Sequence, residues 1–400
     1  MINEKMKKLG VSRSTIRELF EYGKKLKAER GENYVFDYSL GNPSVAPPDA
    51  VNLGIASLLE NVRDVELHGY TSAEGDINTR RAIAKYISEA FSAPASYEYV
   101  YMTAGAAGAL VSVLGALTNE NETVIALAPY FPEYKVFVER NGARLKPVMC
   151  KANDFTPDVD ALDAAIDESV AAVIVNSPNN PTGAVYSEDD IKNLASLLER
   201  KSKQYGKPIY IIADEPYREL VYDGKEVPFI PNYYNNTVVC YSYSKSLSIP
   251  GERIGYAFVS PRADDAKTVM RAICGAGRAL GYVCAPSLLQ KLVPSCIGKT
   301  SDIKLYEENR RMLYEALTSY GFDLVYPSGA FYLFLKSPTG DAKEFSETAK
   351  KYGLLLVPSD DFGCEGYVRI AYCQSPDMIL RSLPYFEKLV GEYKKESKNN

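Results

Sequence analysis

One stretch of the sequence, residues 241–256, gathers side chains that could do chemistry together. It holds Lys245 between two apolar, β-branched runs, which predict buried strands on either side. A lysine in such a place loses hydration, which lowers the pKa of its amine and makes the neutral form available as a nucleophile. Further along, Arg253 keeps its charge at any useful pH and can bind phosphate oxygens, helped by the serine hydroxyls of the same stretch.

These groups suit a site for pyridoxal phosphate (PLP), which needs an amine for its aldehyde and a clamp for its phosphate. The alternative for this stretch alone is a solvated loop with ordinary surface charges. A second candidate, Asp214, stands at the end of the apolar run Ile211-Ile212-Ala213. A carboxylate is costly to bury there unless it meets a positive partner. The protonated pyridine nitrogen of PLP would be such a partner, although Asp214 could instead cap a helix.

Two further loops follow predicted strands. The first, Thr103-Ala104-Gly105-Ala106-Ala107-Gly108, leads into a helix, and its small residues would let backbone N–H groups approach an anion. It lacks the pattern of a dinucleotide-binding or Walker-type loop, and close helix packing is the alternative. The second, Asn176-Ser177-Pro178-Asn179-Asn180-Pro181-Thr182-Gly183, predicts a rigid turn that aims amide side chains at one point, or else a plain turn.

Apolar runs separated by helical segments predict the fold of the first part of the chain. Runs such as Ala171–Asn176 and Pro208–Asp214 are apolar throughout, which indicates a mostly parallel sheet covered by helices on both faces. Ser187 with Asp190 predicts the start of one covering helix. In open α/β sheets ligands bind at the carboxyl ends of the strands, and all four loops follow such ends.

The pattern changes near residue 286 and predicts a second, α+β domain. A long charged helix is expected over Asp302–Ser319. Segments 322–326 and 331–336 suggest a hairpin around Ser328-Gly329, and further strands are expected at Leu354–Val357 and Tyr367–Ala371.

Composition argues against several classes of protein. The formal net charge is −5 with both signs interspersed, which argues against a nucleic-acid surface. No apolar stretch approaches the length of a membrane span and the first residues lack the core of a signal peptide, so we expect a cytoplasmic protein. Seven cysteines without a C-x-x-C pair predict neither a disulfide framework nor a zinc site. His68, the only histidine, is better explained as a structural residue than as a catalytic one.

Together these features resemble the class I and II aminotransferases, fold type I of the PLP-dependent enzymes, from Gly41 to Arg369. The order N-P-T-G, then D-E-P-Y, then S-K followed by R-x-G carries the resemblance. It implies an α/β fold: a large PLP-binding domain (46–285) on a mostly parallel, seven-stranded type of sheet, a smaller α+β domain (286–400) and an N-terminal segment (1–45) packed on the latter. It also implies transfer of an amino group between an L-amino acid and a 2-oxo acid, with 2-oxoglutarate as the expected acceptor.

The resemblance assigns roles residue by residue. Lys245 would hold PLP through a Schiff base and carry protons to and from the reacting carbon, and Asp214 would pair with the pyridine nitrogen. Asn180 and Tyr217 would bind the phenolic oxygen of the ring, and Tyr130 would stack on the ring. The residues that would hold the cofactor's phosphate are Gly105, Ala106, Ala107, Ser242, Ser244 and Arg253.

Substrate and partner follow from the same resemblance. Gly41, Asn180 and Arg369 would bind the α-carboxylate of the substrate, Arg369 with two hydrogen bonds. Tyr70 matches a tyrosine that reaches the phosphate of the neighbouring subunit, which implies a homodimer with shared active sites.

Two departures from some relatives bear on binding, and one is that Tyr130 stands where some aspartate-specific members have a tryptophan. The loop at Ala106 and Ala107 has no hydroxyl, so it could bind phosphate through its backbone only. A dicarboxylic substrate would need a second cation, for which Arg271 and Arg278 are candidates by position; ordinary surface charge is the alternative for both.

Two other functions stay open. A C–S β-lyase or a ring-forming synthase could use the same fold and share Asp214 and Arg369. A PLP-binding regulatory module is the other, but only about forty residues precede Gly41, without the basic recognition helix that a DNA-binding domain needs.

Overall fold

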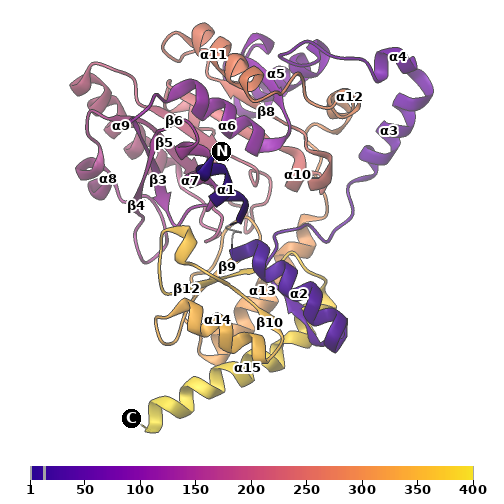
Figure 1. The fold of residues 1–400 in the computed structure, drawn as a ribbon. Helices are drawn as coiled ribbons and strands as arrows, with labels where there is room; N and C mark the ends of the chain where they lie inside the picture. The colour runs from indigo at the N-terminus through magenta and orange to yellow at the C-terminus, as the bar shows by residue number, and fades with distance from the viewer. Residues whose placement is uncertain (1, 12–14, 400) are drawn as a thin grey trace.

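In the computed structural model the chain forms two bodies, each built on its own sheets (Figure 1). The structure describes residues 2–11 and 15–399. The larger body holds a seven-stranded sheet in which every strand except β8 runs in the same direction. In spatial order the strands are β2 (Val100–Thr103), β8 (Gly255–Val259), β7 (Thr237–Ser242), β6 (Tyr210–Asp214), β5 (Val170–Asn176), β3 (Thr123–Ala128) and β4 (Arg144–Met149). The predicted mostly parallel sheet is therefore confirmed.

Helices cover both faces of this sheet, which explains why its strands are apolar throughout. Alternate residues of β3 show the two sides: Val124 and Ala126 belong to one core and Ile125 and Leu127 to the other. One face is covered by α6 (Gly105–Leu117), α7 (Glu133–Glu139) and α11 (Ala266–Ala279). The other is covered by α3 (Asp49–Asn61), α5 (Ile77–Phe91), α8 (Val159–Ala165), α9 (Glu188–Tyr205) and α12 (Ser287–Cys296). In the described part of the chain no helix combines the length and apolar character that crossing a bilayer requires.

The predicted start of α9 is confirmed. The Ser187 hydroxyl accepts a hydrogen bond from the Asp190 N–H at 3.1 Å, and the Asp190 carboxylate accepts one from the Ser187 N–H at 2.9 Å. This reciprocal capping satisfies donors that the first turn of a helix leaves without partners. α9 in turn packs Ile191, Leu194 and Leu198 against the sheet.

The smaller body combines two small sheets with helices. Its antiparallel sheet has the order β11 (Val357–Pro358), β12 (Tyr367–Ala371), β9 (Tyr332–Lys336), and β1 (Phe36–Asp37) pairs in parallel with β10 (Leu354–Leu355). The helices are α2 (Thr15–Arg30), α13 (Ile303–Tyr320), α14 (Ala342–Lys351) and α15 (Pro376–Asn399). The remaining short helices of the chain are α1 (Glu4–Val11), α4 (Asp64–Leu67), α10 (Tyr243–Ser246) and the 3-10 turns Glu32–Tyr34, Tyr97–Tyr99, Ile230–Asn232, Pro250–Glu252 and Asp360–Phe362.

The predicted hairpin around Ser328-Gly329 is confirmed only in part. The segments 322–326 and 331–336 meet in one antiparallel bridge, from Leu324 to Leu335, and the Lys336 N–H donates to the Asp323 carbonyl. The full partner of β9 is β12. Residues 328–330 also pair with residues 220–222: the Tyr222 N–H donates to the Ser328 carbonyl, and the Ala330 N–H donates to the Leu220 carbonyl.

The edge strand β4 is a strand that the sequence did not predict. Its exposed and buried residues do not alternate cleanly, and Pro147 lies within it. Proline is tolerated there because β4 pairs with β3 on one side only.

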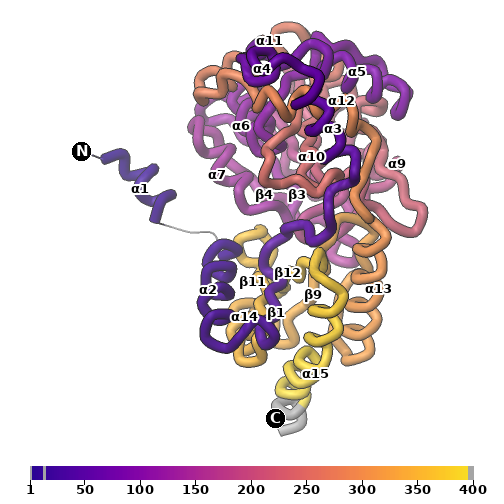
Figure 2. The backbone as a smooth tube through the Cα atoms, turned by 90° about the vertical axis from the view of Figure 1, so that its right-hand side faces the viewer, coloured from indigo at the N-terminus to yellow at the C-terminus, as the bar shows by residue number. Residues whose placement is uncertain are grey.

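The limits of the domains stay a prediction. α12 begins just after the expected boundary at residue 286, yet its Leu289 and Leu292 belong to the core beside the large sheet. We therefore propose that the smaller body begins after α12. The helix α1 buries none of its residues and projects from the rest of the chain in the view of Figure 2, although Lys5 Nζ donates to the Glu139 carbonyl of α7. By contrast, α2 packs on the smaller body.

We expect Ser187→Ala to lower the free energy of unfolding by about 1 kcal/mol, because α9 loses its N-terminal cap. Ser196→Ala is the matched control, since Ser196 lies exposed within the same helix and its hydroxyl donates only to the Lys192 carbonyl. The midpoints of urea unfolding of the two variants check this. Equal midpoints would contradict a stabilising role of the cap.

Candidate active site

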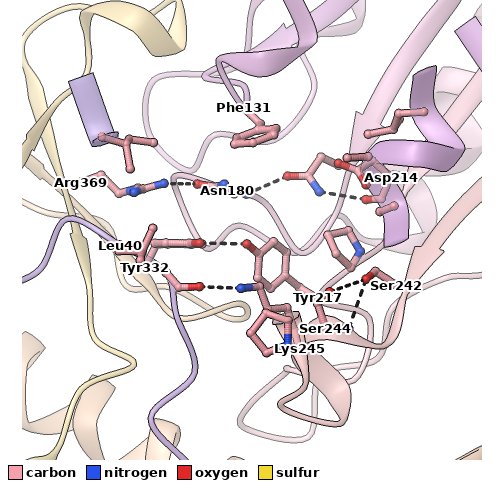
Figure 3. Close-up of a pocket in the computed structure, with 18 of the residues that line it drawn as sticks. Leu40, Phe131, Asn180, Asp214, Tyr217, Ser242, Ser244, Lys245, Tyr332 and Arg369 are labelled. Atoms are coloured by element: carbon pink, nitrogen blue, oxygen red, sulfur yellow. Dashed lines mark hydrogen bonds between the residues drawn. The ribbon is translucent and has the colours of Figure 1, made fainter. Parts of the chain in front are cut away.

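A pocket opens at the carboxyl edge of the large sheet, where this edge faces the smaller body (Figure 3). The larger body contributes residues from the ends of β5, β6 and β7 and from the first turn of α6. The smaller body contributes Tyr332 from β9 and Arg369 from β12, and the N-terminal segment contributes Ile16, Leu40 and Gly41. Of the predicted site residues, the pocket brings together Gly41, Ala106, Ala107, Asn180, Asp214, Tyr217, Ser242, Ser244, Lys245, Arg253 and Arg369.

Asp214 ends β6 and is buried at the back of the pocket. Its Oδ2 accepts a hydrogen bond from the Tyr134 hydroxyl, whereas its Oδ1 is buried and has no partner in the protein. Burial raises the pKa of this carboxyl to about 7; the Tyr134 hydrogen bond opposes the rise and the neighbouring Glu215 adds to it. An unpartnered buried carboxylate oxygen that lines a cavity is a site for a cation or a protonated nitrogen.

Lys245 lies in the short helix α10, directly after β7, and its Nζ donates to the Gly41 carbonyl at 2.5 Å. Burial lowers the pKa of the amine to about 8. The charges of Arg253 and Arg369 lower the pKa further, and the nearby Cys373 opposes the shift. A lysine in this state can both take and release a proton near neutral pH.

Ser242, Ser244 and Arg253 form a cradle beside the first turn of α6. The Ser242 hydroxyl donates to the Ser244 hydroxyl at 2.7 Å, and Arg253 Nη1 lies 3.3 Å from the same Ser244 oxygen. Gly105 opens α6 with φ +77°, and a Cβ on it would lie 2.6 Å from Arg253 Nη2. Only glycine therefore lets the arginine lie against the helix N-terminus, where N–H groups and a guanidinium together suit a phosphate.

Arg369 lies at the opposite end of the pocket and is buried. Its Nη1 donates to Asn180 Oδ1 at 3.0 Å and its Nη2 to the Ser39 carbonyl at 2.6 Å, while its Nε is buried without a partner. The rings of Tyr332 and Phe362 lie 4.6 and 5.3 Å from the guanidinium carbon. A fixed guanidinium with spare donor capacity suits a carboxylate.

Between Arg369 and Asp214 the Tyr217 hydroxyl lies 2.9 Å from the Tyr332 hydroxyl. Burial raises the pKa of Tyr217 well above its ordinary value, and raises that of Tyr332 to about 12. Both phenols therefore stay neutral and can donate hydrogen bonds into the pocket. Tyr332 was not identified from the sequence, because no motif surrounds it.

One predicted site residue needs correction. Tyr130 does not line the pocket; its ring faces Gly363, where a Cβ would lie 2.4 Å from it. The neighbouring Phe131 lines the pocket instead, and Figure 3 shows its ring above the cavity. The aromatic residue that could stack on a cofactor ring is therefore Phe131. The pair of adjacent aromatic residues was visible in the sequence, but which of them turns inward was not.

Gly105 does not line the pocket, and four other residues considered from the sequence also lie outside it: Tyr70, His68, Arg271 and Arg278. The Tyr70 side chain is 89% exposed, and both arginines are exposed on α11. No group of His, Cys, Asp and Glu side chains among the described residues could hold a metal ion.

The residues present fit PLP. The unpartnered Oδ1 of Asp214 could accept a hydrogen bond from a protonated ring nitrogen, and Lys245 Nζ lies in the same pocket. The cradle of Ser244, Arg253 and the start of α6 could hold the phosphate, which leaves Arg369 for a carboxylate.

Comparisons with known proteins agree with this geometry. Residues 37–383 match the family model for aminotransferase class I and II. The chain is 29% identical over 394 residues to the aspartate aminotransferase of Pyrococcus horikoshii, which covers 96% of each chain. It is 28% identical over 368 residues to the probable N-acetyl-LL-diaminopimelate aminotransferase of Bacillus subtilis, which covers 89% of each. The crystal structure of an amino transferase from Eubacterium rectale superposes with a TM-score of 0.96 at 53% identity, covering 98% of this chain and 99% of that one.

We expect Asp214 to contribute a loss of stability to the cofactor-free protein as the pH rises from about 4 to about 7, because its folded-state pKa lies above its unfolded value. Asp214→Asn should remove this part of the pH dependence, which amounts to at most about 4 kcal/mol. Lys245 stays protonated over this window, so it does not contribute.

Melting temperatures of wild type and variant at several pH values check this expectation. The difference between the two proteins, rather than either curve alone, reports on Asp214. Parallel curves between pH 4 and 7 would contradict a buried, unpaired carboxylate.

Proposed function

The chain belongs to the class I and II aminotransferases, which are PLP-dependent enzymes, and we propose that it moves the amino group of an L-amino acid to a 2-oxo acid. The observation that carries this proposal is that Lys245, Asp214 and Arg369 line one pocket. The predicted 2-oxoglutarate is the first acceptor to test. The names of the relatives specify different substrates, so the donor is a separate question.

When bound, PLP supplies an electron sink for the electrons released as the Cα–H bond of an amino acid breaks. Lys245 Nζ takes the proton from Cα and can return it, because a pKa of about 8 keeps both of its forms accessible near neutral pH. Asp214 Oδ1, which has no partner in the protein, would pair with the ring nitrogen and keep a proton on it.

Other residues bind and orient. Arg369 holds the α-carboxylate of the substrate, which fixes Cα relative to Lys245. Arg253, Ser244 and the N-terminus of α6 hold the phosphate. Asn180 and Tyr217, which line the pocket, would donate hydrogen bonds to the ring's phenolic oxygen, and Phe131 would cover the ring.

A C–S β-lyase on the same fold is the alternative. It needs the same lysine and aspartate but no acceptor acid, so the requirement for an acceptor separates the two reactions.

We further propose that the enzyme is a homodimer with shared active sites. The support is Tyr70, a large side chain that is 89% exposed and contributes nothing to the pocket of its own chain. A partner subunit that brings Tyr70 to the phosphate cradle would use this exposed phenol. We also propose, as predicted from the sequence, that the enzyme is cytoplasmic.

In a screen of amino donors we expect amino-group transfer only when a 2-oxo acid is present, and we expect Lys245→Ala to lower turnover at least about a thousandfold. The same variant should lose the visible absorbance of the bound cofactor. Coupled assays of the new amino acid and of free ammonia check this. Release of ammonia and pyruvate without an acceptor would instead identify a lyase.

Shared sites predict complementation between two inactive variants. In a mixed dimer of Lys245→Ala and Tyr70→Ala, one site keeps its own Lys245 and receives Tyr70 from the other subunit. Random mixing after reversible dissociation should then restore roughly a quarter of the wild-type activity. Mixtures that stay as inactive as their components would show that Tyr70 does not serve a neighbouring site.

A further inference from the structure

We infer that Tyr332 directs the phenolic proton of Tyr217 towards the ring oxygen of PLP by donating its own proton to the Tyr217 hydroxyl oxygen. Tyr332 is then a positioning residue, because it acts on the cofactor through Tyr217. This inference rests on the role proposed above for Tyr217, and it adds a residue of the smaller body to the binding of the cofactor.

The two phenols come from different bodies and meet in the pocket (Figure 3). Tyr217 follows β6 of the larger body, whereas Tyr332 is the first residue of β9 in the smaller one. Their hydroxyl oxygens lie 2.9 Å apart, and their rings lie at 83° to each other with centroids 5.8 Å apart. Tyr217 is 5% and Tyr332 2% exposed within a single chain, so the contact does not need a partner subunit.

The surroundings of Tyr332 hold its hydroxyl against Tyr217 and favour it as a donor. The backbone of Gly41 packs so closely that a Cβ there would lie 2.1 Å from the Tyr332 hydroxyl oxygen. On the face of the ring, the Arg369 guanidinium carbon lies 4.6 Å from the centroid. A positive charge beside a phenol draws electrons from its oxygen, which makes the hydroxyl a better donor.

The number of protons decides what Tyr217 can do. Each neutral phenol carries one proton, and the contact between the two hydroxyls uses one of the two. If Tyr332 donates, the Tyr217 proton is left for the cofactor; if Tyr217 donates, it is not. A negatively charged ring oxygen beside Tyr217 favours the first arrangement, because hydrogen bonds to charged acceptors are the stronger ones. Two hydroxyls in series also polarise each other, which strengthens the bond to the ring oxygen.

The direction of this hydrogen bond affects a quantity that can be measured on the bound cofactor. When the nitrogen that joins PLP to Lys245 loses its proton, the neighbouring ring oxygen no longer shares its negative charge with that proton. A hydrogen bond to the ring oxygen therefore favours the deprotonated form and lowers the pKa at which the visible absorbance changes. Loss of this hydrogen bond should raise that pKa.

The charges around the pair stay in place when only the Tyr332 hydroxyl is removed. In the described part of the chain, the charged and titratable groups that face Tyr217, Tyr332 or Lys245 are Asp214, Arg253, Arg369 and Cys373. All four remain in Tyr332→Phe, which also keeps the ring and its packing against Arg369. A shift of the cofactor's pKa in this variant therefore reports on the hydroxyl.

The test is a pH titration of the visible absorbance of the holoenzyme for the wild type, Tyr217→Phe, Tyr332→Phe and the double variant. We expect the pKa to rise by about one unit in Tyr217→Phe, the effect of losing a hydrogen bond to a charged group. In Tyr332→Phe it should rise by about a third of that, the effect of one bond in a series on the next. The double variant should match Tyr217→Phe, because Tyr332 acts only through Tyr217.

Tyr222→Phe is the matched control. It removes another buried hydroxyl from the same core, and the acceptor of that hydroxyl, the Ala330 carbonyl, keeps the Tyr372 hydroxyl as a donor. Tyr222 does not line the pocket, so its variant should leave the pKa unchanged. An equal shift in Tyr222→Phe would assign the effect to packing of the core and overturn the inference.

The sign of the shift separates the two directions of the hydrogen bond. A lower pKa in Tyr332→Phe would show that Tyr217 donates to Tyr332, and it would overturn the inference. So would an unchanged pKa in that variant, or shifts that add in the double variant. A titration that Tyr217→Phe does not move would contradict both the role of Tyr217 and this inference. If the shifts occur as expected but no amino donor reacts with a 2-oxo acid, the inference holds and the proposed function fails.

Discussion

The site depends on the burial of a single carboxylate. Asp214 ends a strand whose preceding residues are apolar and inaccessible, because helices cover both faces of the sheet. The protein offers Oδ1 no hydrogen-bond partner, and Tyr134 satisfies only the other oxygen. In the protein alone this arrangement is unfavourable at neutral pH, which the raised pKa expresses. A protonated heteroaromatic nitrogen would make the ionised carboxylate favourable, because two opposite charges attract strongly where they are poorly screened by water. The buried end of the parallel sheet therefore favours binding of the protonated cofactor ring.

Burial also lowers the pKa of Lys245. The charged groups of the site come from both bodies of the molecule, so the site needs both. Lys245 follows a strand of the large sheet, whereas Arg369 lies in the sheet of the smaller body. Between them the chain from Ser39 to Gly41 accepts hydrogen bonds from both side chains. Gly41 has no alternative here, because a Cβ on it would lie 2.1 Å from the Tyr332 hydroxyl, which also contacts Tyr217. The distance between the Lys245 amine and the Arg369 guanidinium therefore depends on how the two bodies pack against each other.

Local rules were enough to predict much of the fold. The start of α9 could be predicted from Ser187 and Asp190, and the buried strands from continuous apolar runs, because neighbouring residues decide these features. The predictions that failed concern features decided by residues far apart in the sequence. The hairpin around Ser328 forms only one bridge, because its residues 328–330 also pair with residues 220–222, about a hundred positions away in sequence. The choice between Tyr130 and Phe131 depends on the rotation of the chain after β3 and on the space beside Gly363, neither of which a motif records.

The residues of the candidate site fall into the same two groups, those predicted from motifs and those placed by packing. Lys245, Asp214 and Asn180 follow strands of one sheet and could be predicted from their motifs, since the sheet places their loops at one edge. Ile16, Leu40 and Tyr332 come from segments without a motif and reach the pocket only through the packing of the smaller body. The first group touches the parts that every PLP-dependent transamination shares. Ile16 and Leu40 line the same pocket from segments outside the large sheet, so their place in it follows from how the N-terminal segment packs and not from any motif.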